Sequence, residues 1–430
     1  MVNLGVDSEE GDEPPPTVNE KSSLDEIIQN SLAYTIIKRD LSDQEVSSVK
    51  QAKLEGVSLE SSQARYYPQE NLASQVIGFV GGDGTGQYGI EGFYEGILKG
   101  KDGISEQKRG LDAITADDFS YLNGSDLYLT IDYNIQFEAE NLLKEAKQNI
   151  DIDSGQIIVM KPSSGKILAL VNYPTFDPNN YGKESGFDIF QNAAVQKIFE
   201  PGSIFKPFTM AMALEEKKIT PAAKFFDSGS VTIGPDTVFN FDHKKYGEQD
   251  MSGILEKSLN TGAVFLQQKL SRQTFFDYLN KLGINEKTGV DLQGEVSSRN
   301  ELLRKGSDFG YATASFGQGI EMTPVQLVKA FSVFANKGKT AKPYMVEKVV
   351  HGQEVMTTHP EISRQIISEK TAADVTTMMV NVVNRGFGSG GKVEGYNLAG
   401  KTGTAQVPLE NGKGYHADKT IQSFIGFGPA

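Results

Sequence analysis

The sequence predicts an α+β fold, in which one mainly antiparallel sheet is combined with helices. Three observations indicate this class. Two apolar runs over residues 156–171 have the pattern of a strand hairpin, residues 396–407 have the composition of a further strand, and helical patterns fill the chain between them. Strands at both ends of a stretch of helices are typical of α+β domains.

The hairpin is the clearest local signal. Its apolar runs, 156–160 and 166–171, are separated by the turn-forming sequence Pro-Ser-Ser-Gly at 162–165. Upstream, residues 127–130 have the composition of a short strand, and residues 135–150 repeat apolar side chains at helical spacing. We therefore expect a strand, an amphipathic helix and then the hairpin.

Two later helices carry their own boundary signals. Thr323 is a suitable N-cap, Pro324 a suitable first helical residue, and Gln326 completes a capping box. This helix should end near residue 336, because a glycine follows shortly after it. A further helix is expected from about 368 to 386.

Composition limits the classes of function. The chain has 430 residues, which is enough for two or three domains. The net charge of −14, from 56 acidic and 42 basic residues, argues against a nucleic-acid partner, because phosphate binding needs clustered Lys and Arg. The chain has no Cys, which excludes disulfides, thiolate catalysis and Cys-ligated metal and suits an extracytoplasmic protein.

The sequence shows no targeting segment. No run approaches the roughly 18 apolar residues of a membrane span, and the acidic N-terminus differs from an export signal.

Two common nucleotide-binding patterns occur and are rejected on their context. Residues 84–89 match G-x-G-x-x-G, but three further glycines should interrupt the helix that a dinucleotide site requires. Residues 395–402 match the P-loop pattern G-x-x-x-x-G-K-[ST], but strand or turn composition follows Thr402 where a P-loop needs a helix. An ATPase is kept only as an alternative from another class.

The first candidate site is the segment 200–208, where a Pro-Gly turn precedes an apolar helix. Pro207 fits this helix only within its first turn. Ser203 then lies at the helix start, and Lys206 lies one turn later on the same face. The helix dipole favours a developing alkoxide at Ser203, and a desolvated Lys206 could accept its proton. Taken alone, S-x-x-K is common, and an N-cap serine with a surface lysine would explain it.

Two further segments could complete such a site. The sequence Ser-Leu-Asn at 258–260 lies where one helical pattern gives way to another, and its hydroxyl and amide could relay a proton and bind a substrate amide. On the expected strand, Lys401 and Thr402 point to opposite faces. Gly403 has no side chain, so another backbone can approach closely there. An edge strand of this kind can bind an extended peptide.

The order S-x-x-K, S-x-N and K-T-G along one chain is the set described for penicillin-binding proteins and related β-lactamases. On these motifs, the chain resembles the class B penicillin-binding proteins, the monofunctional transpeptidases of division and elongation. The resemblance extends over roughly residues 60–430. It includes segments at 65–68 and 89–95, which look like the family's linker, and at 314–319 and 423–427, which look like its transpeptidase domain.

The resemblance implies a β-lactamase-like transpeptidase domain over 123–430, with helices on both faces of an antiparallel sheet and an all-helical subdomain. A partial pedestal domain of the dimerisation type, with its linker, is expected over 21–122, after a disordered acidic arm over 1–20. The family's N-terminal membrane helix has no counterpart here, and neither does its last sheet strand, which would follow Ala430. We therefore expect a fragment of a longer protein, with its membrane anchor and C-terminal strand missing.

By position, the resemblance makes Ser203 the acylated nucleophile and Lys206 its general base. It assigns the proton relay and the donor peptide to Ser258 and Asn260, and the substrate carboxylate to residues of the K-T-G strand. No metal or cofactor is implied. The complete implied set comprises the catalytic residues Ser203, Lys206, Ser258, Asn260 and Lys401, the substrate-binding residues Thr402, Gly403 and Thr404, and oxyanion-hole N–H groups of Ser203 and Thr404. The four histidines, His243, His351, His359 and His416, are expected to be incidental surface residues.

The implied reaction is acyl transfer on D-Ala-D-Ala, with an amine of a neighbouring stem peptide resolving the ester on Ser203. The implied partners are peptidoglycan stem peptides, β-lactam antibiotics and a membrane-embedded glycosyltransferase of the division or elongation machinery. The implied location is the extracytoplasmic face of the cell membrane. A D,D-carboxypeptidase, a β-lactamase-like hydrolase and a catalytically incompetent fragment that binds penicillin remain alternatives.

Overall fold

The computed structural model describes residues 2–5, 34–38, 41–59, 65–100, 123–408 and 415–430. Contacts divide the chain into two units, Met1–Tyr66 and Tyr67–Ala430. Residues 67–100, which the sequence assigns to a pedestal and linker, therefore pack with the second unit.

The first unit contains a small antiparallel sheet with the strand order β2-β1-β3. Its helix begins with the capping box of Ser42 and Glu45. The sequence predicts that residues 1–20 are disordered, but Val2–Gly5 form strand β1, so the prediction is wrong for these four residues. Residues 6–20 lie outside the described part of the chain. The elements are β1 (Val2–Gly5), β2 (Tyr34–Lys38), α2 (Asp43–Ala52) and β3 (Val57–Leu59).

The second unit begins with a glycine-rich segment that packs on the larger domain. Val76 and Ile90 share a hydrophobic cluster with Ile167 and Leu170. A short helix begins at the third glycine of the G-x-G-x-x-G pattern and includes Gly92, but it ends at Phe93, so the helix is interrupted as expected. It has only five residues, and the adjoining strands are antiparallel, so the pattern still lacks a dinucleotide fold. The elements are α3 (Ser74–Ile77), β4 (Phe79–Val80), β5 (Gly86–Gln87), α4 (Gly89–Phe93) and α5 (Glu95–Leu98).

The expected strands and helix of the sheet region are confirmed. The hairpin β7–β8 is antiparallel, and α6 packs on β8 through Ala139, Leu143 and Val171. Strands β15 and β16 form a second antiparallel pair. Among the described residues no hydrogen-bonded ladder joins the two pairs, so the predicted single sheet is present as separate pairs. The elements are β6 (Asp126–Leu129), α6 (Tyr133–Ile150), β7 (Gly155–Met160), β8 (Ile167–Tyr173), β15 (Ala399–Pro408) and β16 (Tyr415–Phe427).

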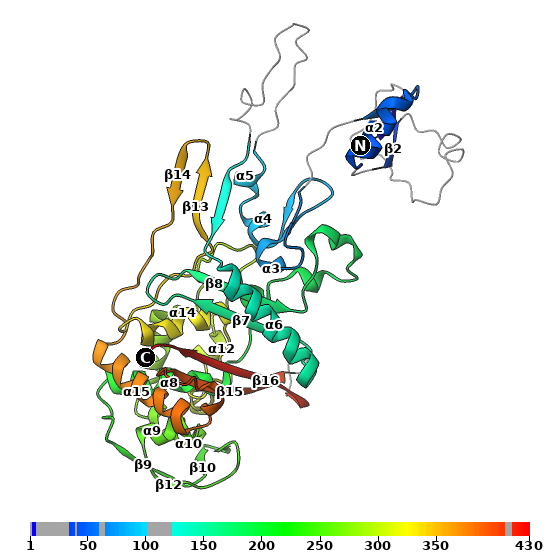
Figure 1. Ribbon diagram of the computed structural model, residues 1–430. Coiled ribbons are helices and arrows are strands. Elements are labelled where there is room, and N and C mark those ends of the chain that lie inside the picture. The colour runs from blue at the N-terminus through cyan, green and yellow to red at the C-terminus, as the bar shows by residue number, and fades with distance from the viewer. Residues whose placement is uncertain (1, 6–33, 39–40, 60–64, 101–122, 409–414) are drawn as a thin grey trace. The chain divides into compact units, whose positions relative to one another are not determined.

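Helices such as α8 and α15 lie beside β15 (Figure 1). They enclose the main core, in which Phe205, Phe208 and Phe331 are buried together. The capping box that the sequence predicts at Thr323 and Gln326 is present. The helices are α7 (Ala193–Gln196), α8 (Lys206–Glu215), α9 (Met251–Glu256), α10 (Asn260–Gln267), α11 (Arg272–Lys281), α12 (Glu301–Arg304), α13 (Asp308–Ala314), α14 (Pro324–Ala335) and α15 (Glu369–Arg385).

Short helices and strands connect the elements described above. The 3₁₀ helices are η2 (Pro178–Lys183), η3 (Phe187–Phe190), η4 (Gly202–Phe205) and η5 (Ser389–Gly391). The remaining strands are β9 (Lys224–Asp227), β10 (Ser230–Ile233), β11 (Asp236–Phe239), β12 (Gly247–Asp250), β13 (Val346–His351) and β14 (Glu354–Thr357). Within the described residues, none of the helices has the length and apolar character needed to cross a membrane.

Candidate active site

The turn that carries Ser203 is fixed by close backbone contacts. Gly202 has a φ of +61° and donates its N–H to the carbonyl of Gly317 at 2.9 Å. A Cβ on Gly202 would lie 2.8 Å from the carbonyl oxygen of Thr404. The turn is therefore held between the Gly317 loop and strand β15, a position that only a residue without a side chain permits.

Helix α8 follows this turn and is apolar on all sides, as predicted. Every residue from 206 to 214 is buried, and Pro207 lies in the first turn of the helix. The helix places Lys206 inside the core with 1 % of its surface exposed. The surface-lysine interpretation of S-x-x-K is therefore wrong, because this lysine is desolvated.

Lys206 and Lys401 converge on Ser258. The Nζ of Lys206 donates to the carbonyl oxygen of Ser258 at 2.5 Å and lies 3.1 Å from its Oγ. The Nζ of Lys401 donates to the same Oγ at 2.9 Å. The three predicted motifs, which are far apart in the sequence, thus meet around one hydroxyl.

Burial changes the protonation of both lysines. Burial, followed by the nearby charge of Lys401, lowers the pKa of Lys206 well below its ordinary value. Burial alone lowers the pKa of Lys401 to about 7. No carboxylate in the described part of the chain forms an ion pair with either lysine, so no opposite charge offsets the cost of burying theirs. Lys206 can therefore be neutral near physiological pH and accept a proton.

The S-x-N segment lies in the tight connection between α9 and α10, as predicted. Ser258 itself adopts a left-handed conformation with a φ of +52°. Asn260 begins α10, and its Nδ2 donates to the carbonyl of Phe239 at 2.9 Å. This bond leaves the amide oxygen of Asn260 as the group that could accept from a ligand.

A buried polar network supports this connection, and the sequence analysis did not find it. The carboxylate of Asp227 is 1 % exposed and accepts bonds from the hydroxyl of Thr261 at 2.7 Å and from Nδ2 of Asn240 at 2.9 Å. Backbone N–H groups of Gly229 and Tyr246 also donate to it. Because Thr261 follows Asn260 directly, the network anchors the start of α10. Asp227 ends a short strand without a recognisable motif, so no sequence signal pointed to it.

Strand β15 shows the expected alternation, since Lys401 is fully buried and Thr402 is partly exposed. The close backbone approach predicted at Gly403 comes from the chain itself. A Cβ on Gly403 would lie 2.9 Å from Cγ2 of Ile204 and 3.1 Å from the carbonyl oxygen of Pro201. The K-T-G strand thus packs directly on the turn that carries Ser203. Thr404 is partly exposed, and its Oγ1 donates to Gln422 on β16 at 2.9 Å.

Similarity to known proteins agrees with this arrangement. Residues 155–430 match the family described as the penicillin binding protein transpeptidase domain, and residues 13–129 match the penicillin-binding protein dimerisation domain. The chain belongs to the penicillin-binding protein transpeptidase family. The P-loop alternative is thereby excluded, and the matching residues 395–402 run into strand β15 without a helix.

Relatives with similar sequences have names that agree with this family. Stage V sporulation protein D of Bacillus subtilis is 33% identical over 96% of this chain, which spans 64% of that protein. The probable peptidoglycan D,D-transpeptidase PenA of Neisseria meningitidis is 32% identical over 94% of this chain, which spans 68% of it. The crystal structure of penicillin binding protein 3 of Mycobacterium tuberculosis has 30% identity and a TM-score of 0.74, covering 84% of this chain and 80% of that one.

A complex of the same mycobacterial protein with aztreonam is also similar, with 29% identity and a TM-score of 0.75. It covers 85% of this chain and 81% of that one. These likenesses confirm the predicted fold, namely a penicillin-binding transpeptidase domain with an N-terminal dimerisation-type domain. The predicted domain boundaries remain predictions.

This penicillin-binding protein does not form every predicted contact in the described structure. No hydrogen bond to Oγ of Ser203 is found among the described residues, so the contact between Ser203 and Lys206 remains a prediction. His243, His351 and His359 are exposed and His416 is half-buried, and none of them contacts the lysine cluster. The described residues contain no group of three or more metal-binding side chains.

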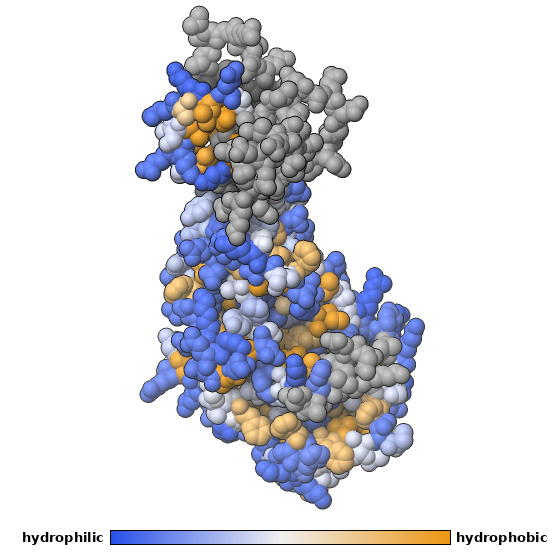
Figure 2. Space-filling view, turned by 90° about the vertical axis from the view of Figure 1, so that its right-hand side faces the viewer, coloured by the Kyte–Doolittle hydropathy of each residue, from blue (hydrophilic) through white to orange (hydrophobic). Residues whose placement is uncertain are grey.

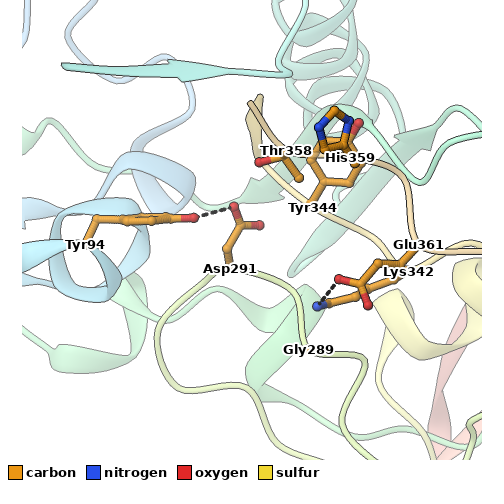
Figure 3. A pocket seen from close by; sticks show the side chains of 8 residues that line it. All are labelled: Tyr94, Gly289, Asp291, Lys342, Tyr344, Thr358, His359 and Glu361. Carbon is orange, nitrogen blue, oxygen red and sulfur yellow. Dashed lines mark hydrogen bonds and ion pairs between the residues drawn. The ribbon is translucent and has the colours of Figure 1, made fainter. Parts of the chain in front are cut away.

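A small cavity of about 140 Å³ lies where the glycine-rich segment meets the transpeptidase domain (Figure 3). The carboxylate of Asp291 accepts from the hydroxyl of Tyr94 at 3.0 Å and from the backbone N–H groups of Met345 and Val346. Burial, and then the charge of Asp291, raises the pKa of Tyr94. Asp291 therefore accepts hydrogen bonds from the protein itself, and these bonds connect the glycine-rich segment to the transpeptidase domain.

Proposed function

We propose that this protein is a serine-type peptidoglycan D,D-transpeptidase that β-lactams acylate. The observation that carries the proposal is the convergence of two desolvated lysines, Lys206 and Lys401, on Ser258 beside the turn that holds Ser203. A neutral lysine can activate a serine, and a charged lysine can bind the carboxylate of a D-Ala-D-Ala peptide.

The first half-reaction would acylate Ser203. Its Oγ attacks the carbonyl carbon of the penultimate D-Ala, and its proton passes to Nζ of Lys206. Backbone N–H groups of Ser203 and Thr404 stabilise the oxyanion that forms. The close approach of Gly202 to Thr404 supports this pairing. The C–N bond then breaks, and the proton reaches the leaving amine of D-Ala through Ser258.

The second half-reaction would resolve the ester. An amine of a neighbouring stem peptide attacks the acyl carbon, Ser203 recovers its proton, and a peptide crosslink is formed. Asn260 and Thr402 would hold the donor peptide along the open edge of β15. A D,D-carboxypeptidase or a β-lactamase uses the same serine with water as the acceptor, so the acceptor is what distinguishes these activities.

Two further proposals follow from the family. An enzyme that acts on peptidoglycan stem peptides works at the extracytoplasmic face of the cell membrane. A membrane-embedded glycosyltransferase, which makes the glycan that carries those peptides, is the partner that this activity requires. The name of one relative, the probable peptidoglycan D,D-transpeptidase PenA, supports a peptidoglycan substrate, on which both proposals depend.

Intact-mass measurement after incubation with benzylpenicillin tests the proposal. We expect one stable adduct with the mass of the intact penicillin, and none in Ser203→Ala. A synthetic stem pentapeptide with and without an amine acceptor then separates the activities. Crosslinked product supports the transpeptidase, whereas hydrolysed product alone supports a carboxypeptidase. Rapid release of penicilloate would indicate a β-lactamase, and a folded protein without any adduct would indicate a scaffold.

A further inference from the structure

A second, larger pocket lies away from the lysine cluster, with a volume of about 400 Å³. Two segments of the second unit form it. One is the β4–β5 hairpin with the residue that follows it, and the other contains η2, η3 and the loop between them. The two segments lie on the side of Figure 1 that faces the viewer in Figure 2, where hydrophobic residues reach the surface in separate patches.

The floor of the pocket is a packed aromatic cluster. The ring of Phe79 stacks on Tyr181 with centroids 4.2 Å apart and an interplanar angle of 15°. Phe190 meets the edge of Phe79 at 5.0 Å and lies 5.6 Å from the ring of Tyr88. These contacts fix the ring planes before any ligand arrives, so a flat apolar ligand face would lose little freedom in ordering the site.

The rim adds an exposed ring. Phe187 lines the pocket, although 79 % of its surface is exposed to solvent. Leaving an aromatic side chain in water forgoes roughly 1.5–3 kcal/mol of burial free energy. An exposed ring beside a preformed aromatic pocket is therefore what a binding site for an apolar surface requires.

Polar side chains line the pocket beside these rings. The side chains of Gln87, Glu184 and Ser185 line the pocket and form no hydrogen bond to any described residue. A Cβ added to Gly182 or Gly186 would meet no atom within 4 Å, so the backbone there is open to a ligand. An amide, a carboxylate and a hydroxyl around aromatic planes suit a ligand with one apolar face and several hydroxyl groups at its edge.

We propose that this pocket binds an N-acetylhexosamine unit of the glycan strand to which the stem peptides are attached. The proposal rests on the proposed function, because an enzyme that acts on stem peptides meets their glycan on its surface. A pyranose ring presents C–H bonds to Tyr181 and Phe187, and its hydroxyls reach Gln87 and Glu184. The lining contains one carboxylate and no cation, so an uncharged sugar fits it and a polyanion does not.

The chain has no Trp, which allows a single reporter to be introduced at the rim. In Phe187→Trp, we expect chitotetraose, an uncharged chain of N-acetylhexosamine units, to change the tryptophan fluorescence with saturation in the millimolar range or below. Glu184→Ala in the same reporter should weaken binding at least tenfold. A matched reporter, Phe226→Trp, replaces an exposed ring on β9 that does not line the pocket, and its fluorescence should not respond.

Acylation by penicillin, measured in the same variants, separates this proposal from the proposed function. Normal acylation with no response to chitotetraose would overturn the sugar site and leave the transpeptidase intact. A response that persists in Glu184→Ala at full strength, or that Phe226→Trp shares, would also overturn the site. So would binding of a proline-rich peptide in place of the glycan, which would assign the pocket to a protein partner. Saturable glycan binding in a protein that penicillin does not acylate would support the site and reject the transpeptidase.

Discussion

Lys401 donates a 2.9 Å hydrogen bond from Nζ to Oγ of Ser258, although 143 positions separate the two residues. The bond joins a strand to the connection between two helices. Because Lys206 reaches the same Oγ from a third element, Ser258 can pass a proton between two lysines whose pKa values are both lowered. The arrangement separates a proton-accepting lysine from one that can hold a substrate carboxylate.

The acylation rate should depend on pH through both lysines. The rate should rise as Lys206 loses its proton, at a pH far below the value of about 10.4 for an ordinary lysine, because burial lowers its pKa. The rate should fall as the pH rises past about 7, where Lys401 loses the charge that binds the carboxylate of penicillin. Stopped-flow acylation with benzylpenicillin from pH 5 to 10 checks this profile.

The methyl ester of benzylpenicillin provides the control, because it lacks the carboxylate. Its acylation should be slower, and the alkaline fall should be absent from its profile. A rate that keeps rising to about pH 10 with the free acid would show that these lysines titrate as ordinary ones, and it would contradict the prediction.

Lys401→Met should inactivate the protein and stabilise it. Acylation should fall by about 10²-fold or more, because the lysine that contacts Ser258 is lost. The pKa of Lys401 is about 7 in the folded state and about 10.4 in an unfolded chain. Between these values the unfolded state binds more protons, so the wild-type free energy of unfolding rises with pH. The variant should therefore gain about 1 kcal/mol or more at pH 7, and less as the pH approaches 10.

Urea unfolding at pH 7 and pH 9.5 measures this difference. Lys392→Met removes a lysine that is exposed, and its stability should follow the wild type at both pH values. An equal gain for Lys401→Met at the two pH values would mean that packing, and not charge burial, explains the stabilisation.

Much of the fold could be predicted from the sequence, because its signals are local. The helix that starts at Pro324 was predictable from its capping box, and the β7–β8 hairpin from two apolar runs around a turn. Ser203, Lys206, Ser258 and Lys401 could be grouped because they belong to motifs with a fixed order. The apolar sequence around Lys206 predicted a buried helix, but the distances at which Lys206 and Lys401 meet Ser258 could not be predicted, since they depend on how distant parts of the chain pack together.

Gly403→Ala should slow acylation by about tenfold or more. The added Cβ would lie 2.9 Å from Ile204 and 3.1 Å from the carbonyl oxygen of Pro201, so the turn that carries Ser203 must shift. A shift of about 1 Å in a reacting group can cost 10²-fold in rate. Gly390→Ala is the matched control, because its Cβ would meet nothing within 4 Å. Equal acylation rates in the two variants would argue against the close packing of β15 on this turn.

The residues that the sequence did not reveal are those that act through long-range polar contacts. Asp227, Asn240 and Thr261 belong to no motif and come together only when the antiparallel strand pairs β9–β12 and β10–β11 fold beside α10. Asp227 is the last residue of a short strand, so no alternation of apolar and polar residues in the sequence indicates that its side chain is buried. Buried carboxylates of this kind are found only once the hydrogen-bond partners are known.

Asp227→Asn should therefore reduce both stability and acylation. The carboxylate accepts bonds from Gly229, Asn240, Tyr246 and Thr261, and an amide nitrogen in its place would face these donors. A buried polar group left unpaired costs about 1–3 kcal/mol, so Tm should fall by several degrees. Because Thr261 is next to Asn260, the S-x-N connection should loosen, and acylation should slow by about tenfold at a temperature where the variant is folded.

Asp242→Asn controls for a general effect of removing a carboxylate from this region. Asp242 accepts from the hydroxyl of Tyr246 at 2.6 Å and from the backbone of Lys244, but it is less buried than Asp227. Its loss should change Tm less and leave acylation near the wild-type rate. If Asp227→Asn lowers Tm but is acylated as fast as Asp242→Asn, Asp227 stabilises the fold without positioning Asn260. A rate that falls only for Asp227→Asn, under conditions where both variants are folded, requires the network to act on the S-x-N connection.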